Sequence, residues 1–408
     1  MTPGAEAPSS AADAALLLDK AREALTRMRT YRRDFDGAHR MAHDAQVREA
    51  LTRNELTVAL QESLTSRAEM EARLRDWALA AYASRGAMPM RRRNRISRRI
   101  DRLLARLGSL GQAVVIARSG VWRASGRPLH DLRHMAAYAR RRARGDVAPL
   151  APLDQAWYLA QNADVSRARM APLVHYLTTG ADEGRSPGPL FDESWYRLQN
   201  GAELAATGLT ALEHYVRVGA VRGLNPHPLF DTCHYLAQAP VLAPGDDPMS
   251  HYLREGGAQG LSPHPLFDPA YYGARAGDLG GAPALTHYLT QGWRDGLSPH
   301  PLFDPVWYRH QAPDLADTGE EPLTHFLAFG GNEGRDPSPW FDTLGYRAAR
   351  GEALPEGVNP LIDYLKGGAW AVAEPRPGFP TAAYLASRPD LARSGVTPLE
   401  HWARRQGR

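Results

Sequence analysis

The sequence predicts an all-α protein whose larger part is a tandem helical repeat. The string Pro-Leu-Phe-Asp ends at Asp192, Asp231, Asp268 and Asp304, and the variant Pro-Trp-Phe-Asp ends at Asp342. A second string, His-Tyr-Leu or a close variant, recurs between these sites. Alternating apolar runs typical of β-strands are nearly absent, whereas apolar residues at helical spacing are common. Self-similarity at a fixed period indicates a repeat architecture.

Residues 1–84 precede the repeat and have a polar, helical pattern after a short start rich in Pro, Gly, Ala and Ser. Such a start favours disorder. Met70, Leu74, Trp77 and Ala81 then mark one face of a later helix. We expect a helical hairpin or a short coiled coil here, with homo-oligomerisation as its use.

Residues 85–150 form an arginine-rich segment. Between residues 85 and 146 there are 17 arginines and three aspartates, a charge of 17 − 3 = +14 in a chain whose net charge is +4. Part of this segment predicts an amphipathic helix with one apolar stripe and an arginine-covered remainder. The stripe consists of Ile96, Ile100, Leu103, Leu104 and Leu107.

A second basic helix is expected to begin at Pro128, with Leu129, Leu132, Met135 and Ala136 facing inward. Across the segment we identify a set of arginines as candidates for binding a membrane or another anion. They are Arg91, Arg92, Arg93, Arg95, Arg98, Arg99, Arg102, Arg106, Arg140, Arg141, Arg142 and Arg144.

Three interpretations of these arginines remain open. A basic amphipathic helix can lie on an anionic membrane surface. It can bind nucleic acid by releasing counterions, although the sparse aromatics and the lack of a known motif make this the weaker alternative. It can also dock on the acidic repeat region.

Residues 151–408 hold seven copies of the repeat. Copy 1 begins at Pro152, copies 2 to 6 begin with the five strings that end in Asp, and copy 7 begins near Gly378. The second string has one fixed position per copy, which we call the His slot. Successive slots lie 39, 37, 36, 38, 38 and 38 residues apart. The slots are His175, His214, His251, His287, His325, Asp363 and His401.

Each copy predicts a first helix that starts at its Asp. A carboxylate at this N-cap accepts hydrogen bonds from the free amides of the first turn. In copy 2, Phe191 and Tyr196 then occupy the two positions of a hydrophobic staple. Pro269 and Pro305 stand at the first helical position, where a missing N–H costs nothing.

A second helix is expected in each copy from sequences such as Asn359-Pro360 and Thr397-Pro398. A glycine follows the His slot by five residues, for example at Gly180 and Gly330, and suits a left-handed residue that ends the helix. The Pro- and Gly-rich link to the next copy is expected to be extended. Copies this short cannot bury their own apolar faces, so stacked neighbours should share a core in a helical solenoid.

The sequence contains no pattern that predicts a catalytic residue, a metal site or a cofactor. Asp34 and Asp36 form an Asp-x-Asp pair, but within a polar helical region. Equivalent histidines of stacked helices would lie about 8–10 Å apart, too far to share a zinc ion. We therefore interpret the slot histidines, and the five Asp residues Asp192, Asp231, Asp268, Asp304 and Asp342, as structural.

Other histidines and the one cysteine allow weaker hypotheses. His227, His264 and His300 lie in Pro-His-Pro links, either as a binding stripe or, as we favour, in solvated linkers. The pairs His39/His43 and His130/His134 are spaced to share a metal, but surface histidines are the better interpretation. Cys233 is expected to be a buried or half-buried thiol.

Several strings of the repeat resemble a known bacterial family. Beside Phe-Asp-x-x-Trp-Tyr and Pro-Leu-x-His-Tyr-Leu stand Asp164-Val165, Asp314-Leu315 and Asp390-Leu391, and the Glu-Gly-Arg strings Glu183–Arg185 and Glu333–Arg335. This pattern, over about residues 151–408, resembles a repeat found beside glycosyltransferase domains in proteins of surface-polysaccharide synthesis. In those proteins the chemistry resides in a separate nucleotide-sugar-binding domain, whose pattern we do not find.

The resulting hypothesis is a non-catalytic scaffold linked to surface-polysaccharide synthesis, whose repeat region presents a surface to a protein or glycan partner. A glycosyltransferase relative with an unrecognised active site is one alternative, and a nucleic-acid-associated protein is the other. The start of the chain lacks a secretory pattern and there is one cysteine, so we expect a cytoplasmic protein, peripheral at the inner membrane.

Overall fold

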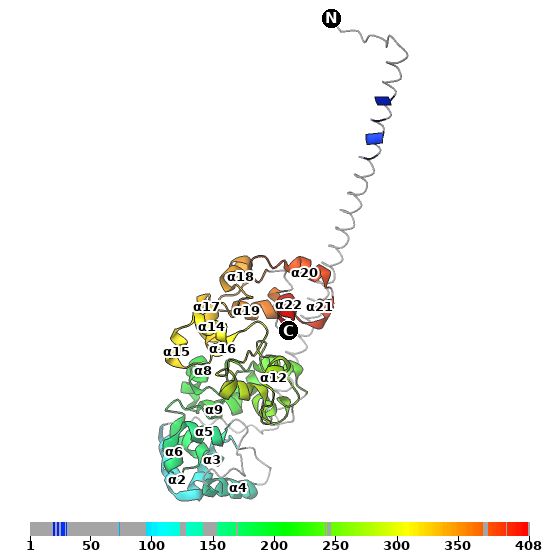
Figure 1. Cartoon of the computed structure of the whole chain (residues 1–408). Helices are drawn as coiled ribbons and strands as arrows, with labels where there is room; N and C mark the ends of the chain where they lie inside the picture. Colours follow the sequence, from blue (N-terminus) through cyan, green and yellow to red (C-terminus); the bar gives the residue numbers. More distant parts are fainter. Residues whose placement is uncertain are drawn as a thin grey trace, which may run out of the picture. The chain divides into compact units, whose positions relative to one another are not determined.

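The protein is helical in a computed structural model. This structure describes residues 19–20, 23, 26–28, 30, 73, 95–122, 128–141, 153–168, 170–240, 242, 246–369, 374–388 and 390–406. These residues form helices, turns and isolated β-bridges, which confirms the all-α class (Figure 1). The expected hairpin or coiled coil in 1–84 lies almost entirely outside the described residues.

The chain divides into two compact units, one of residues 1–61 with Ala382–Gly395 and one of Glu62–Thr381 with Val396–Arg408. The helices described in the first unit are α20 (Thr381–Ser387), which begins at the boundary, and α21 (Asp390–Ser394). The arginine-rich helices and the remaining helices of the repeat belong to the second unit. No described helix is both long and apolar enough to span a membrane.

The arginine-rich segment forms three helices, α2 (Arg95–Arg106), α3 (Gly108–Ser119) and α4 (Pro128–Arg141). The first and last of these agree with expectation, and α4 begins at the expected Pro128. The middle helix was not foreseen, because its central apolar run is short and has no clear helical stripe. Gly108 has a φ of 76°, which turns the chain between α2 and α3.

Helix α3 runs back along α2 as an antiparallel hairpin. The Gln112 amide donates to the Ala105 carbonyl at 3.2 Å, and near the far end Arg118 pairs with Asp101 at 2.9 Å. A side chain on Gly111 would collide with the Leu104 carbonyl, so this glycine allows the close approach of the two helices. The expected inward face of α4 is only partly correct: Met135 is buried, but Leu129 is exposed.

In copies 1 to 6 the first helix begins after its Asp. These helices are α5 (Gln155–Gln161), α8 (Glu193–Thr207), α10 (Thr232–Gln238), α12 (Pro269–Ala276), α14 (Pro305–Gln311) and α18 (Thr343–Arg350). Helix α8 is interrupted by non-helical backbone at Asn200. Short helices follow the first helix in copies 1 and 5, namely α6 (Ala163–Ala168) and α15 (Asp314–Thr318). In copy 2 the predicted staple is present, with the Phe191 and Tyr196 rings 5.3 Å apart.

The second helix of each copy starts as one α-helical turn. These turns are α7 (Pro172–His175), α9 (Ala211–His214), α11 (Pro248–His251), α13 (Ala284–His287), α16 (Pro322–His325) and α19 (Pro360–Asp363), and copy 7 has α22 (Pro398–Gln406). The expected cap at Asn359 is confirmed, since its side chain accepts from the amide of Leu361 at 3.0 Å.

In copies 1 to 6 the helix then widens into a π-helical turn that ends at the predicted glycine. The turns are η1 (Tyr176–Gly180), η2 (Tyr215–Gly219), η4 (Tyr252–Gly256), η5 (Tyr288–Gly292), η6 (Phe326–Gly330) and η8 (Tyr364–Gly368). Three further short elements are η3 (Ala220–Arg222), α17 (Gly331–Glu333) and η7 (Gly351–Ala353).

The predicted role of these glycines as left-handed helix ends is wrong. Gly180 and Gly330 continue the helix, and the residues with positive φ come four positions later, for example Gly184 at 74° and Gly334 at 84°. The reason for glycine is packing. In each of the six copies an added Cβ would overlap the hydroxyl of a tyrosine from the first helix, such as Tyr158 at Gly180.

The links are not extended as expected, but close into tight turns held by an isolated bridge, for example His264 with Phe267. Each link between two copies is also bonded back to the earlier copy. The amide of that copy's N-cap Asp donates to the carbonyl of a proline in the link. The six bonds run from Asp154 to Pro187, Asp192 to Pro226, Asp231 to Pro263, Asp268 to Pro299, Asp304 to Pro337 and Asp342 to Pro375, at 2.9–3.1 Å. This recurring bond connects neighbouring copies through backbone alone.

Candidate interaction surfaces

The slot histidines of copies 1 to 5 hydrogen-bond to a buried tyrosine of their own first helix. The tyrosine oxygen lies 2.6–2.8 Å from the histidine Nδ1. The pairs are Tyr158 with His175, Tyr196 with His214, Tyr235 with His251, Tyr272 with His287 and Tyr308 with His325. Each of these tyrosine hydroxyls therefore connects the first helix of a copy to the second helix of the same copy.

Copy 6 shows which partner donates in this bond. Its slot is Asp363, and the Tyr346 hydroxyl donates to the carboxylate at 2.6 Å. Arg350 also donates to this carboxylate, at 2.8 Å, so Asp363 accepts from both side chains. Since aspartate stands where the other copies have histidine, we infer that the tyrosine donates to Nδ1 in copies 1 to 5.

The other ring nitrogen of three slot histidines faces a carboxylate. Nε2 of His214 is 3.5 Å from Glu203, that of His325 is 3.5 Å from Asp314, and that of His251 is 3.8 Å from Glu255. The tyrosine–histidine–carboxylate order resembles an acid–base relay, but burial raises the pKa of Tyr308 well above its usual value. The hydroxyl thus stays protonated, and the arrangement suits a structural hydrogen-bond network better than a nucleophile.

The five repeat Asp residues cap their helices. The carboxylates of Asp192, Asp231 and Asp342 each accept one amide of the first turn, and those of Asp268 and Asp304 accept two. The remaining slot residue, His401, lies half-exposed on α22.

Two of these caps also bind a cation from a copy three positions further along the chain. Lys366 of copy 6 lies 3.1 Å from Asp231 of copy 3, and Arg404 of copy 7 pairs with Asp268 of copy 4. Both cations stand three residues after their His slots. Burial alone would raise the pKa of Asp231, but Lys366 and the amide of His234 lower it overall. These contacts join residues that are 135 and 136 positions apart in the chain.

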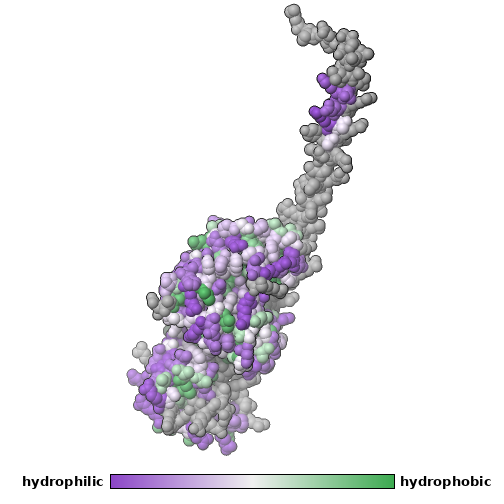
Figure 2. Space-filling model, in the orientation of Figure 1, coloured by the Kyte–Doolittle hydropathy of each residue, from purple (hydrophilic) through white to green (hydrophobic). Residues whose placement is uncertain are grey.

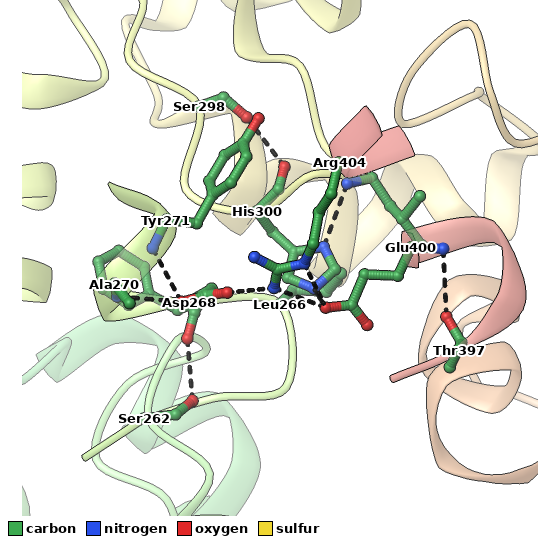
Figure 3. A network of polar contacts seen from close by, with 12 residues as sticks. Ser262, Leu266, Asp268, Ala270, Tyr271, Ser298, His300, Thr397, Glu400 and Arg404 are labelled. Carbon is green, nitrogen blue, oxygen red and sulfur yellow. Dashed lines mark hydrogen bonds and ion pairs between the residues drawn. The ribbon is translucent and has the colours of Figure 1, made fainter. Parts of the chain in front are cut away.

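Figure 3 shows the network around Arg404. Its guanidinium lies between the carboxylates of Asp268 and Glu400, the second at 2.7 Å, and 5.8 Å from the ring centre of Tyr271. Nε2 of His300 is 3.9 Å from Glu400. These residues belong to copies 4 and 7 and to the link that follows copy 4, so the network joins copies rather than lining a substrate pocket.

The interpretation of the Pro-His-Pro histidines as solvated is wrong. His227, His264 and His300 are buried, and the Nδ1 of each accepts the amide two residues later at 3.0–3.2 Å. Burial lowers the pKa of His227 to about 4 and that of His264 to about 3. These rings close the link turns in their neutral form and are unavailable as an exposed binding stripe.

The candidate arginines fall into different environments. Arg98 and Arg102 pair with Asp182 of copy 1 at 2.7 and 3.1 Å. Arg98 also donates to the Gly208 carbonyl and Arg102 to that of Thr178. Docking on the acidic repeat is therefore observed for these two arginines.

The remaining candidates make no such contact or lie outside the description. Arg99, Arg106 and Arg140 are exposed on α2 and α4. Arg95 and Arg141 stand at the ends of these helices, where the side chains are not described. The candidates outside the described residues are Arg91, Arg92, Arg93, Arg142 and Arg144.

The apolar stripe of α2 points away from the repeat. Leu103 is 61% exposed and Leu107 is 71% exposed, and Leu110 of α3 is 68% exposed. The polar face of α2 is instead the inner one, since Asp101 is buried against Arg118. Figure 2 shows that the drawn face of the molecule is otherwise largely hydrophilic, with apolar spots scattered among polar side chains.

The His130/His134 pair and Cys233 lie on the surface. His130 and His134 are both exposed, with their Nε2 atoms 3.1 Å apart, and no third metal-binding side chain joins them in the described part of the chain. Cys233 is exposed, not buried as expected, because it stands on the outer side of the first turn of α10. His39, His43, Asp34 and Asp36 lie outside the described residues.

One structural residue was missed by the sequence analysis. Tyr138 of α4 is buried, and its hydroxyl accepts the amide of Leu173 in copy 1 at 3.1 Å. In the repeat, Tyr176 accepts from Leu212 and Tyr364 from Leu399 in the same way. The spacing 176 − 138 = 38 equals the period and was the available signal. Helix α4 thus packs on copy 1 as a preceding copy would.

No family model matches the chain, and no curated protein or solved structure is significantly similar to it.

Proposed function

We propose that the protein is a non-catalytic scaffold of bacterial surface-polysaccharide synthesis. In this proposal the seven copies form a helical solenoid that presents a surface to a protein or glycan partner. The protein acts in the cytoplasm, peripheral at the inner membrane, and self-associates through its N-terminal helices. The association with polysaccharide synthesis rests on the resemblance of the repeat strings.

The observation that supports a scaffold best is the contact between copies three apart. The Lys366–Asp231 and Arg404–Asp268 pairs add to the backbone bonds between neighbours. An array with contacts both between neighbouring copies and between copies three apart resists bending. A hinge motion between two neighbours would break the contacts between copies three apart. A surface with fixed spacing suits the simultaneous binding of several groups of one partner.

A genetic experiment tests the proposal. Host cells that lack this protein should carry less surface polysaccharide, and the full chain should restore it. Unchanged polysaccharide in the deletion strain would contradict the proposed role. If the purified chain itself released nucleotide from a nucleotide sugar, the glycosyltransferase alternative would replace it.

A further inference from the structure

The α2–α3 hairpin has an outer surface that combines exposed apolar and cationic side chains. On α2, Ile100, Leu103 and Leu107 follow one another at helical spacing and are all exposed. On α3, Leu110 and Val114 are exposed as well. We call these five residues the apolar stripe of the hairpin.

The hairpin aligns the two parts of this stripe. Gln112 contacts Ala105, and Arg118 contacts Asp101 and Ser97, so residues whose numbers add to about 217 lie level with one another. Leu103 is therefore level with Val114, and Leu107 with Leu110. The exposed residues of α2 continue onto α3 instead of being separated along the chain.

The orientation of α2 is fixed by its other side. Arg98 and Arg102 reach the carboxylate of Asp182 and two backbone carbonyls of the repeat. Asp101 and Ala105, on the same side, are buried. A rotation of α2 that hid the apolar stripe would break these bonds and leave Asp182 without its two arginines.

The charge around the stripe is positive throughout. Between residues 95 and 119 the sequence has six arginines, and its one acidic residue, Asp101, is buried against Arg118. Arg99 and Arg106 are exposed beside the stripe. Three more arginines, Arg91–Arg93, directly precede the helix in sequence.

We propose that the apolar stripe of the α2–α3 hairpin inserts into the surface of an anionic lipid bilayer, with Arg99 and Arg106 contacting the lipid phosphates. This inference rests on the proposed peripheral position and assigns the face that produces it. Exposed leucines flanked by arginines match the interfacial zone of a membrane, where apolar groups enter the acyl boundary and cations meet anionic headgroups.

The same charges argue against other occupants. A second copy of the hairpin would place two arginine-rich surfaces in contact, and juxtaposed like charges oppose association. A nucleic acid would use the arginines, but phosphate contacts do not account for five exposed aliphatic side chains. Of these three occupants, a lipid surface is the one that makes use of both groups.

The test is co-sedimentation of the full-length protein with vesicles that contain anionic phosphatidylglycerol, compared with vesicles of zwitterionic phosphatidylcholine alone. The wild type should pellet with the anionic vesicles and be partly released by salt. The double variant Leu103→Asp/Leu107→Asp should lower the partition coefficient by about tenfold or more for each leucine. The double variant Arg99→Gln/Arg106→Gln should lower it by about fivefold for each arginine.

Matched controls lie on the repeat. Leu198 and Leu344 are 77% and 62% exposed, so Leu198→Asp/Leu344→Asp adds the same charge at similar exposure. Arg167→Gln is the control for the arginine variants, since it removes the charge of an exposed arginine in copy 1. Circular dichroism and thermal unfolding should show that all variants remain folded, because every substituted side chain is exposed.

Each result has a defined meaning. A wild-type protein that stays in the supernatant with anionic vesicles would overturn the proposal, while the scaffold role would remain open to the polysaccharide experiment. Equal losses in the hairpin and control variants would overturn the assigned face. Loss of binding only on replacing Arg91–Arg93 would keep a membrane contact but move it away from the stripe. If sedimentation velocity showed that Leu103→Asp/Leu107→Asp turned a dimer into a monomer, the occupant would be a second copy.

Discussion

At the scale of single residues, one tyrosine in each of copies 1 to 6 restricts which residue can stand at two other positions. The hydroxyl of Tyr346 donates to Asp363 and occupies the space where a side chain on Gly368 would begin. The same relation holds for Tyr158, His175 and Gly180 in copy 1. The slot residue and the glycine five positions later are therefore parts of one packing unit around the tyrosine.

Adjacent glycines in copy 6 allow a direct test of this unit. We predict that Gly368→Ala lowers the free energy of unfolding by about 1–3 kcal/mol, because the added methyl group overlaps the Tyr346 hydroxyl in a filled core. Gly367→Ala is the control, since nothing lies within 4 Å of its added Cβ. Urea denaturation gives both values, and equal stability of the two variants would refute the packing role.

The buried link histidines predict a dependence of stability on pH. Burial lowers the pKa of His264 to about 3, whereas an unfolded histidine has a pKa of about 6.5. The unfolded chain therefore binds a proton that the folded chain does not. The stability from the neutral ring is fully present above pH 6.5 and is lost as the pH falls from about 6.5 toward 3.

We predict that His264 accounts for a loss of about 2 kcal/mol in the free energy of unfolding between pH 7 and pH 5. His264→Asn keeps an acceptor near the Leu266 amide but cannot titrate, so its stability should fall less over this range. The measurement is urea denaturation at both pH values, with His310→Asn as an exposed control. An unchanged pH dependence in His264→Asn would show that the ring has the same pKa in the folded and the unfolded protein.

At the scale of helices, local sequence determined where elements start better than which way they face. The caps at Asp192 and Asn359 and the start of α4 at Pro128 agree with prediction, because capping depends on residues within one turn. The outward stripe of α2 was not predictable in the same way. Its orientation depends on Asp182, which is 80 residues further along the chain from Arg102.

The prediction for the glycines was wrong for a related reason, namely that it used local sequence alone. A glycine after a helix is usually a left-handed end, and only the tyrosine from another helix reveals the steric requirement at Gly180. The buried link histidines were missed because a Pro-rich segment reads as exposed until the turn is seen to close around His264. Features set by contacts between elements were thus beyond the local pattern.

Helix α4 should stabilise the repeat as a preceding copy does. We predict that Tyr138→Phe lowers the free energy of unfolding by about 1–3 kcal/mol, because the buried amide of Leu173 loses its acceptor. Tyr364→Phe, which removes the equivalent acceptor from Leu399, should have a similar effect. Urea denaturation compares the two. A neutral Tyr138→Phe would mean that α4 does not substitute for a copy.

At the scale of the whole repeat region, contact between copies three apart distinguishes this protein from a linear stack. In a stack each copy touches only its neighbours, and stability is a sum of copies and nearest interfaces. Here the Arg404–Asp268 pair links copies 7 and 4, and Lys366–Asp231 links copies 6 and 3. Both pairs use the N-cap carboxylate, so one residue serves a local and a distant contact.

A double-mutant cycle measures this distant contact. Asp268→Asn retains the helix cap but removes the charge, and Arg404→Gln removes the cation. We predict a coupling of about 0.5–1 kcal/mol between the two substitutions in the free energy of unfolding, since both side chains are partly exposed to solvent, and a smaller coupling at high salt.

The matched cycle pairs Arg404→Gln with Asp304→Asn. Asp304 caps α14 in the same way, but it has no ion pair in the described part of the chain. Its coupling with Arg404 should be close to zero. If the Asp268 cycle also gave no coupling, copies would interact through neighbours alone, and the array would lose the rigidity on which the scaffold proposal depends. A coupling confined to Asp268 would show instead that copies 4 and 7 interact directly in the folded protein.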